Sequence, residues 1–260
     1  TVPKEVLTLP QKYAVNFHDG PLPRYAGVNA TNWAIMNGET IHAITWHVMT
    51  DEINAGDILK QKTVPISEGE TAISLHAKCY EKSIEAFAEL IDEIAEDRVK
   101  PIQQDLRNRT YFGRWKRPPA GCVVDWSRTA EEIDALFRGL DFGYYRNPLG
   151  LPKIFVGNHA IVARKIEILD GKPGKVPGTI TRVSDNRVNV ATATREVGLG
   201  EFTGWNGEQL SPSNFLKAAG LGVGDGLPKL GDEDVDKISK VNLQVCKHEE
   251  FWADRLASLE

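Results

Sequence analysis

Hydrophobic and β-branched residues gather in three short runs along the first quarter of the chain, separated by polar or Gly/Pro-rich segments. The runs 13–17, 42–49 and 57–66 have the length and composition of strands. The first run leads into a Gly/Pro-rich segment, which predicts a loop, and the polar segment 50–56 must be the loop between the other two. This part of the chain is therefore expected to contain a small sheet with two prominent loops.

Helical spacing appears twice in the same part of the chain. Residues 29–37 have apolar side chains at helical intervals, with Gly38 placed to end the helix. Residues 71–94 carry an apolar stripe with a period near 3.6 residues and acidic residues opposite it, which predicts a long amphipathic helix.

A different pattern follows from residue 108, where a domain boundary is expected. Ser127 or Thr129 is a candidate N-cap for a helix over 130–139. Residues 151–195 then give several short β-like runs broken by Gly, Pro and Asn, which favours a small antiparallel barrel.

The end of the chain changes composition again. Residues 221–240 are rich in Gly and Asp and predict a flexible acidic linker, and 248–259 has the spacing of a helix. The expected divisions are 1–107, 108–221, 222–246 and 247–260.

Charge and cysteine usage narrow the function classes. With 31 Lys+Arg against 36 Asp+Glu, the formal charge of −5 gives no overall positive field for phosphates, and nucleic-acid binding is not favoured. Cys79, Cys122 and Cys246 have no zinc-site or disulfide spacing, so we expect no metal site and a reducing cytoplasm. No apolar run approaches the roughly 20 residues of a membrane span, and no signal-peptide pattern opens the chain, so a soluble protein is expected.

Two polar residues at the end of the first strand are candidates for catalysis. Asn16 and His18 are two residues apart, so their side chains project to one face of the strand. An amide beside an imidazole suits acyl transfer, because both can hydrogen-bond the oxyanion of a tetrahedral intermediate. The alternative is that they only cap a turn. His47 and His76 are expected to be ordinary core or boundary residues.

These residues lie in a segment that resembles the folate-dependent formyltransferase family. Residues 16–27 are similar to its Asn-x-His signature followed by Leu-Pro-x-Tyr/Trp-x-Gly, and 47–59 is similar to its second, folate-contacting signature. The resemblance implies an α/β fold with a doubly wound, Rossmann-like sheet and 10-formyltetrahydrofolate as formyl donor. It also implies that Asn16 and protonated His18 stabilise the oxyanion, while the folate pocket is lined by Thr50, Asp51, Glu52 and Ile53.

One position departs from the family pattern. Alignment of Ala55-Gly56 places Asn54 where the family has an aspartate that orients the histidine and assists proton removal from the amine. An amide is uncharged and accepts no proton at neutral pH, so a severe loss of rate is expected. An engineered substitution and a natural loss of catalysis both remain open. Asp51, Glu52 and Asp57 are the nearby carboxylates that would have to replace it.

The resemblance extends beyond the first domain. The family normally places several β-α units before the Asn-x-His strand, whereas only residues 1–11 precede it here, so we expect a partial doubly wound sheet. Residues 124–133 are similar to the start of the OB-like C-terminal domain of methionyl-tRNA formyltransferases.

The terminal segment 248–260 is similar to the opening helix of condensation domains in nonribosomal peptide synthetases. It implies neighbouring synthetase domains and, as acceptor, the amine of an aminoacyl group on a carrier protein. A loosely docked terminal helix is the alternative for this segment. For the whole chain, the alternatives are a non-catalytic scaffold or interaction module, and a tRNA or nucleotide-sugar formyltransferase.

Overall fold

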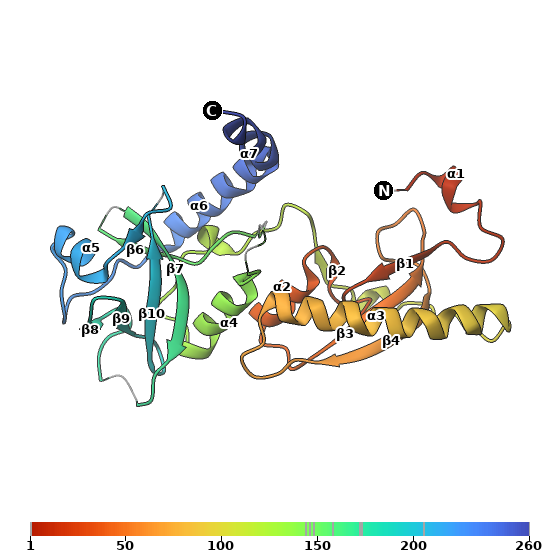
Figure 1. Cartoon of the computed structure of the whole chain (residues 1–260), viewed down its shortest axis with the longest axis horizontal. Helices are drawn as coiled ribbons and strands as arrows, with labels where there is room; N and C mark the ends of the chain where they lie inside the picture. The colour runs from red at the N-terminus through yellow and green to blue at the C-terminus, as the bar shows by residue number, and fades with distance from the viewer. Residues whose placement is uncertain are drawn as a thin grey trace. The chain divides into compact units, whose positions relative to one another are not determined.

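The chain forms two compact units, Thr1–Arg114 and Trp115–Glu260 (Figure 1). The computed structural model describes residues 2–143, 145, 147, 149–157, 159–171, 174–204 and 206–259.

An antiparallel sheet of three strands, in the order β1-β3-β4, forms the centre of the first unit. Its strands are β1 (Val15–His18), β3 (Ile41–Val48) and β4 (Ile58–Pro65). The smaller elements of this unit are α1 (Lys4–Leu7), β2 (Ala26–Gly27), α2 (Ala30–Met36), η1 (Leu106–Asn108) and β5 (Tyr111–Phe112). Strands β2 and β5 pair in parallel. The three predicted strands are thus confirmed, and their pairing is antiparallel.

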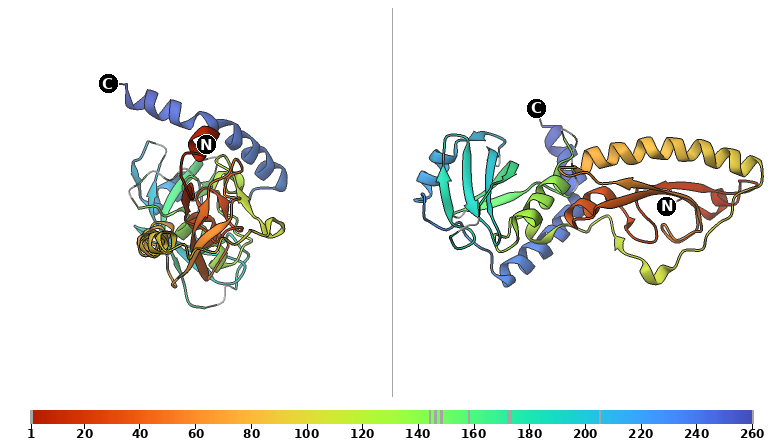
Figure 2. Two further views of the ribbon diagram at one scale, coloured as in Figure 1. Left: turned by 90° about the vertical axis from the view of Figure 1, so that its right-hand side faces the viewer. Right: turned by 90° about the horizontal axis from the view of Figure 1, so that it is seen from below.

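The long helix α3 (Ala72–Ala95) runs along one face of this sheet (Figure 2). It begins with a capping box, in which the Thr71 side chain accepts from the Ser74 backbone and the Ser74 side chain accepts from the Thr71 backbone. Its inner face buries small and apolar side chains, including Leu75 and Leu90. The ring of Phe87 stacks on Trp46 of β3 with centroids 4.6 Å apart. The predicted helix is therefore confirmed, but the apolar stripe that predicts it is not its buried face, because Tyr80, Ile84 and Ile91 of that stripe are at least half exposed.

The second unit is built on a curled antiparallel sheet in the order β6-β7-β10-β9-β8, with β11 paired to β10. Its strands are β6 (Lys153–Val156), β7 (His159–Ile168), β8 (Ile180–Val183), β9 (Arg187–Ala191), β10 (Glu196–Thr203) and β11 (Gln209–Leu210). One core holds this sheet together around Trp126, which is 1% exposed. The antiparallel strands predicted over 151–195 are confirmed, and β10 extends the sheet beyond them.

Helix α4 (Ala130–Leu140) packs its apolar face into the same core. Of the two candidate N-caps, Thr129 is the one used: its side chain accepts from the Glu132 backbone, and Glu132 closes a capping box. The other short elements are η2 (Pro119–Gly121) and α5 (Pro212–Ala218).

The prediction of a flexible linker over 222–246 is wrong for its second half, which forms helix α6 (Asp232–Val245). Three acidic residues in the first turn suit the positive end of the helix dipole. The helix packs on η2, where the Ser239 hydroxyl accepts a 2.9 Å hydrogen bond from the Ala120 backbone. Tertiary packing, which composition does not report, therefore orders this segment.

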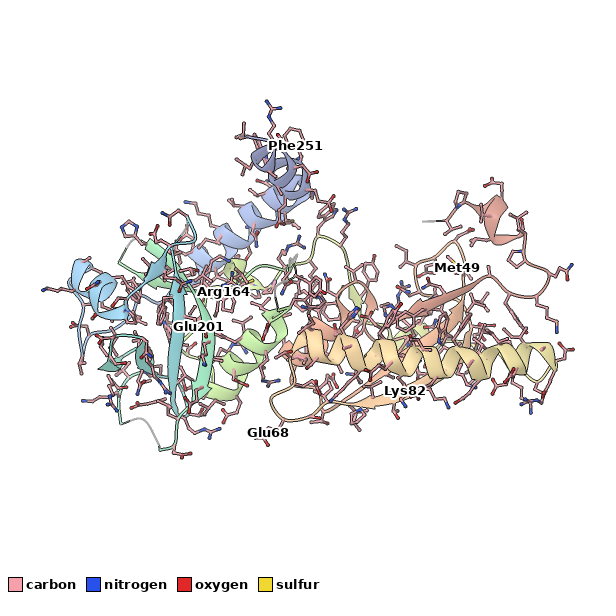
Figure 3. All side chains as sticks on the ribbon, in the orientation of Figure 1. Met49, Glu68, Lys82, Arg164, Glu201 and Phe251 are labelled. Carbon is pink, nitrogen blue, oxygen red and sulfur yellow. The ribbon has the colours of Figure 1, made fainter. Side chains whose placement is uncertain are left out.

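The predicted terminal helix is confirmed as α7 (Glu249–Ala257), which follows η3 (Cys246–His248). Its Phe251 side chain, labelled in Figure 3, is 60% exposed. All three cysteines are free and buried. Among the helices of the described residues, none is both long and apolar enough to cross a membrane.

Candidate functional site

The predicted pair Asn16 and His18 lies on β1, beside β3. Asn16 stands directly opposite His47 in the antiparallel register. Its Nδ2 lies 3.2 Å from His47 Nε2 and also donates to the Phe17 carbonyl at 3.0 Å. The side chain that Asn16 contacts is therefore His47, which the sequence pattern predicts to be an ordinary core or boundary residue.

Asn54 reaches the same imidazole from the loop between β3 and β4. Its backbone is in the left-handed region, with φ of 54°, a conformation that Asn tolerates better than most residues. The buried side chain accepts a 3.0 Å hydrogen bond from the Gly27 backbone through Oδ1. Its Nδ2 lies 3.3 Å from His47 Nε2. Asn16, His47 and Asn54 thus form one group, called the His47 cluster below.

The protonation of His47 follows from its partners. Nδ1 lies 2.8 Å from the Val48 carbonyl, which only accepts, so Nδ1 carries the hydrogen. Nε2 is then the acceptor for the two amide groups of Asn16 and Asn54. Burial lowers the pKa of His47, the Val48 hydrogen bond raises it in part, and repulsion from His18 lowers it further. The cluster therefore holds a neutral imidazole at neutral pH.

His18 occupies a buried site of its own. It is 5% exposed, and its Nε2 donates to the Tyr25 carbonyl at 2.8 Å. Gly20 permits this packing, because a Cβ there would lie 2.7 Å from the same nitrogen. Burial lowers the pKa of His18, and the charge of Asp19 raises it in part. Since Nε2 is occupied, Nδ1 is the nitrogen left to gain or lose a proton.

The expectation that residue 54 orients His18 is not met. The side-chain hydrogen bonds of Asn54 go to Gly27 and His47, whereas His18 bonds to Tyr25. The physical reason is the strand register, which sets His47 opposite Asn16 and places His18 opposite Thr45.

The loop that follows Met49 (labelled in Figure 3), whose residues 50–53 are expected to line a folate pocket, is fixed by two side chains from later in the chain. Gln104 donates to the carbonyls of Asn54 and Gly56 at 3.0 and 2.6 Å. Arg109 donates to the Ile53 carbonyl at 2.6 Å and pairs with Glu52. The loop conformation is therefore held by residues about 50 positions away.

The side chains expected in the pocket differ in their surroundings. The Thr50 hydroxyl donates to the Glu52 carbonyl at 3.0 Å, Asp51 pairs with Lys4, and the Ile53 side chain is exposed. Asp57 is also exposed. Asp51 and Glu52 are thus paired to cations, and Asp57 faces solvent. None of these three nearby carboxylates occupies the place of an aspartate at residue 54.

Sequence reasoning missed His47 and Gln104 as members of the site. His47 can be recognised only when the register of β1 and β3 is known, because that register places it opposite Asn16. Gln104 carries none, because its contacts lie on a loop distant in sequence. Within the residues that the structure describes, no group of His, Cys, Asp and Glu side chains is arranged to hold a metal ion.

Known proteins are similar to this chain both in sequence and in fold. A methionyl-tRNA formyltransferase of Clostridium novyi (strain NT) is 31% identical over 190 residues, which are 73% of this chain and 59% of that protein. The N-formyltransferase of Helicobacter canadensis, solved with folinic acid and dTDP-3-aminofucose, superposes with a TM-score of 0.60 at 20% identity. That match covers 72% of this chain and 65% of the solved one.

HypX of Aquifex aeolicus, solved in complex with tetrahydrofolic acid, gives a TM-score of 0.59 at 20% identity and covers 83% of this chain and 38% of that one. The chain therefore spans less than two thirds of each of these three relatives. At such identities the two solved structures establish the fold alone. They confirm the α/β class, with a Rossmann-like formyltransferase domain followed by a curled antiparallel sheet of the OB-like kind.

Two family models match most of the chain. The model for formyl transferase matches residues 1–91, and the model for the formyl transferase C-terminal domain matches residues 118–220. On these matches, supported by the clostridial relative, the chain belongs to the formyl transferase family.

Proposed function

We propose that this chain contributes the site at which a formyl group passes from 10-formyltetrahydrofolate to an amine. The observation that carries the proposal is the convergence of the Asn16 and Asn54 amides on His47, beside the buried His18. These residues belong to the two segments that carry the family signatures. Two of the solved relatives were determined with folinic acid or with tetrahydrofolic acid, which supports a folate donor.

In the proposed reaction the acceptor amine attacks the formyl carbon, a new C–N bond forms, and the bond from that carbon to the folate nitrogen breaks. The oxygen of the tetrahedral intermediate carries negative charge that an amide N–H stabilises. Both hydrogens of the Asn16 amide are engaged, one by Phe17 and one by His47. The oxyanion would therefore take the hydrogen that now faces His47.

Proton movement is assigned to His18. Its Nδ1, which carries no hydrogen in the neutral ring because Nε2 donates to Tyr25, would take the proton of the attacking amine and pass it to the departing folate nitrogen. Removing the proton of the attacking amine is the step for which residue 54 is unsuited, because the Asn54 amide accepts no proton at neutral pH. Residues 50–53 would line the folate site, with Arg109 holding the Ile53 carbonyl and Gln104 the adjoining Asn54 carbonyl.

For the acceptor we propose an aminoacyl group carried by a peptide-synthetase carrier protein. The support is the similarity of 248–260 to the start of a condensation domain, together with a formal charge of −5, which does not favour tRNA. Mass spectrometry of an aminoacyl carrier protein, an initiator tRNA and an amino-sugar nucleotide, each incubated with the intact protein and 10-formyltetrahydrofolate, tests it. Formylation of the carrier-bound amine alone is expected, and formylation of either other acceptor instead would refute the choice.

A non-catalytic interaction module is the second candidate, and one observation favours it. The Asn54 amide accepts from Gly27 and donates to His47, so residue 54 offers the cluster no carboxylate base. A protein that binds the folate donor yet formylates none of the three acceptors, even with Asn54→Asp, would be this module. For either candidate we propose a cytoplasmic location, supported by three free, buried thiols.

A further inference from the structure

A cavity of the second unit lies between two hairpins and helix α5. Its volume is about 610 Å³, and it is half open to solvent. One wall comes from the turn between β6 and β7, a second from the loop between β10 and β11, and a third from α5. Cavities of about 300–1,000 Å³ are of the size at which proteins hold small molecules. This cavity shares no residue with the His47 cluster.

Small side chains keep the cavity open. Phe215, Ala218 and Ala219 stand on one face at the end of α5, because residues three and four apart on a helix are neighbours. Opposite them lie Gly157 and Ala160 of the β6-β7 hairpin. A Cβ on Gly157 would lie 3.7 Å from the Cβ of Ala219, so the helix and the hairpin approach closely here. Larger side chains at these positions would fill the space.

The floor of the cavity is apolar and belongs to the core of the unit. Val156 and Ile161 line it and are 2% and 5% exposed. The Phe215 ring meets the buried Phe202 ring edge to face, with centroids 5.2 Å apart, and Leu210 packs against the same core. The core therefore fixes these side chains before any ligand arrives, which lowers the entropic cost of binding.

Three exposed polar residues, His159, Asn206 and Glu208, also line the cavity. The loop that carries Glu208 is closed by a 3.0 Å hydrogen bond from the Gly204 backbone to the Glu208 carbonyl. The Asn206 side chain accepts from the Glu208 backbone at 3.3 Å. A Cβ on Gly204 would lie 2.6 Å from Oε1 of Glu208, so the glycine makes room for the carboxylate.

The charge in the lining is one-sided. Among the described residues that line the cavity, Glu208 is the one acidic residue, and none is Lys or Arg. A carboxylate accepts strong hydrogen bonds from an ammonium group and repels another carboxylate. The volume is also several times the roughly 150 Å³ of a cavity that binds benzene, so an aromatic ring with a short arm fits.

We propose that this cavity binds a small primary amine with an apolar body, of the arylalkyl ammonium class. Glu208 holds the ammonium group, and the body packs on Phe215 and Leu210. The size of the cavity, its apolar floor and its single carboxylate carry the assignment. The inference goes beyond formyl transfer and does not depend on it.

The test compares three probes that share one apolar body: 2-phenylethylamine, 2-phenylethanol and phenylacetate. Each is titrated into the full chain at low salt and pH 8 without folate or acceptor, and backbone amide shifts are followed by NMR. Saturable shifts in β7, β11 and α5 are expected, with the amine binding about two- to fivefold tighter than the alcohol and phenylacetate weakest. An alcohol that binds as tightly as the amine, or shifts confined to other elements, would overturn the proposal.

Two variants separate the charge from the cavity. Glu208→Gln keeps the size of the side chain and should bring the affinity for the amine down to that for the alcohol. Glu201→Gln is the matched control, because Glu201 (labelled in Figure 3) is an exposed carboxylate of β10 outside the lining. It should change neither affinity. An amine affinity that Glu208→Gln leaves unchanged would refute the role of the carboxylate.

Ala218→Trp tests the cavity itself. Ala218 is exposed on α5, so a larger side chain there should fill the space without entering the core. Binding of the amine and the alcohol should both be lost, and retained binding would refute the location. If Ala218→Trp does not fold, Ala218→Leu, which fills less of the space, should weaken both probes, and undiminished binding would refute the location equally.

Discussion

Restoring a carboxylate at residue 54 is the perturbation with the sharpest consequence for the site. In Asn54→Asp, one carboxylate oxygen keeps the 3.0 Å hydrogen bond from the Gly27 backbone, because it accepts as the amide oxygen does. The other oxygen replaces the Nδ2 donor that lies 3.3 Å from His47 Nε2. Since Nδ1 already donates to Val48, a proton on Nε2 makes the imidazole a cation.

The magnitude follows from that distance. Two unit charges 3.3 Å apart attract by about 5 kcal/mol at an effective dielectric constant of about 20. Desolvation of the new carboxylate offsets part of this, so a rise of about 1–3 units in the pKa of His47 is expected. If the same carboxylate also serves as general base, formyl transfer should accelerate by a factor of about 10²–10⁴.

The assay is single-turnover formyl transfer by the intact protein, read by mass spectrometry, with the His47 titration measured in parallel by NMR. Asn29→Asp is the matched control: Asn29 also has a left-handed backbone, with φ of 57°, and its side chain makes no cap hydrogen bond. It should change neither readout. An unchanged His47 titration in Asn54→Asp would refute the geometry of the cluster. A raised pKa without faster transfer would refute the catalytic role of residue 54.

Three further predictions concern stability. The three buried histidines of the first unit have folded-state pKa values below 6.5, so the unfolded chain binds their protons first. Stability should therefore fall as the pH drops below about 6.5, by up to about 1.4 kcal/mol per pH unit for each; a urea midpoint that rises between pH 7 and 5.5 would contradict this. His76 acts in the opposite direction, because its pKa, raised by its hydrogen bond with Asp19, adds stability below 6.5 that is lost as the pH rises through its folded-state value. Gln104→Glu replaces the donor to two loop carbonyls by an acceptor, and should lower the free energy of unfolding by about 1–3 kcal/mol in urea denaturation; an unaltered midpoint would show that the loop is held otherwise. Thr129→Ala should cost about 1 kcal/mol through its lost capping box, and Ser211→Ala, an N-cap without a cap hydrogen bond, should cost less; equal thermal midpoints would count against the capping.

Local patterns predicted most elements of the fold. The strands β1, β3 and β4 and the helices α2, α3 and α4 were all visible in hydrophobic spacing and capping residues. Strand β10 was missed, because Gly198 and Gly200 weaken its strand pattern. Gly198 is used for close packing: a Cβ there would lie 2.1 Å from the Arg187 guanidinium. Helix α6 was missed because its stability comes from packing on η2.

The sequence predicts part of the candidate site, but not its members His47 and Gln104 and not the contacts among its side chains. Spacing identified Asn16 and His18, and the family resemblance singled out Asn54. The contact of Asn54 with His47 depends on strand register and on a loop that Gln104 holds from 50 positions away in sequence. Neither is encoded in a local window, so the wrong histidine was expected as the partner of residue 54.

The tautomer of His47 in the unmodified protein tests the central claim about this site most directly. In a two-bond ¹H–¹⁵N spectrum of histidine-labelled protein at pH 7, we predict a protonated Nδ1 and an unprotonated Nε2 for His47. That result follows if Nδ1 donates to Val48 and Nε2 accepts from the two amides. A protonated Nε2, whether in the other tautomer or in an imidazolium, would contradict the arrangement.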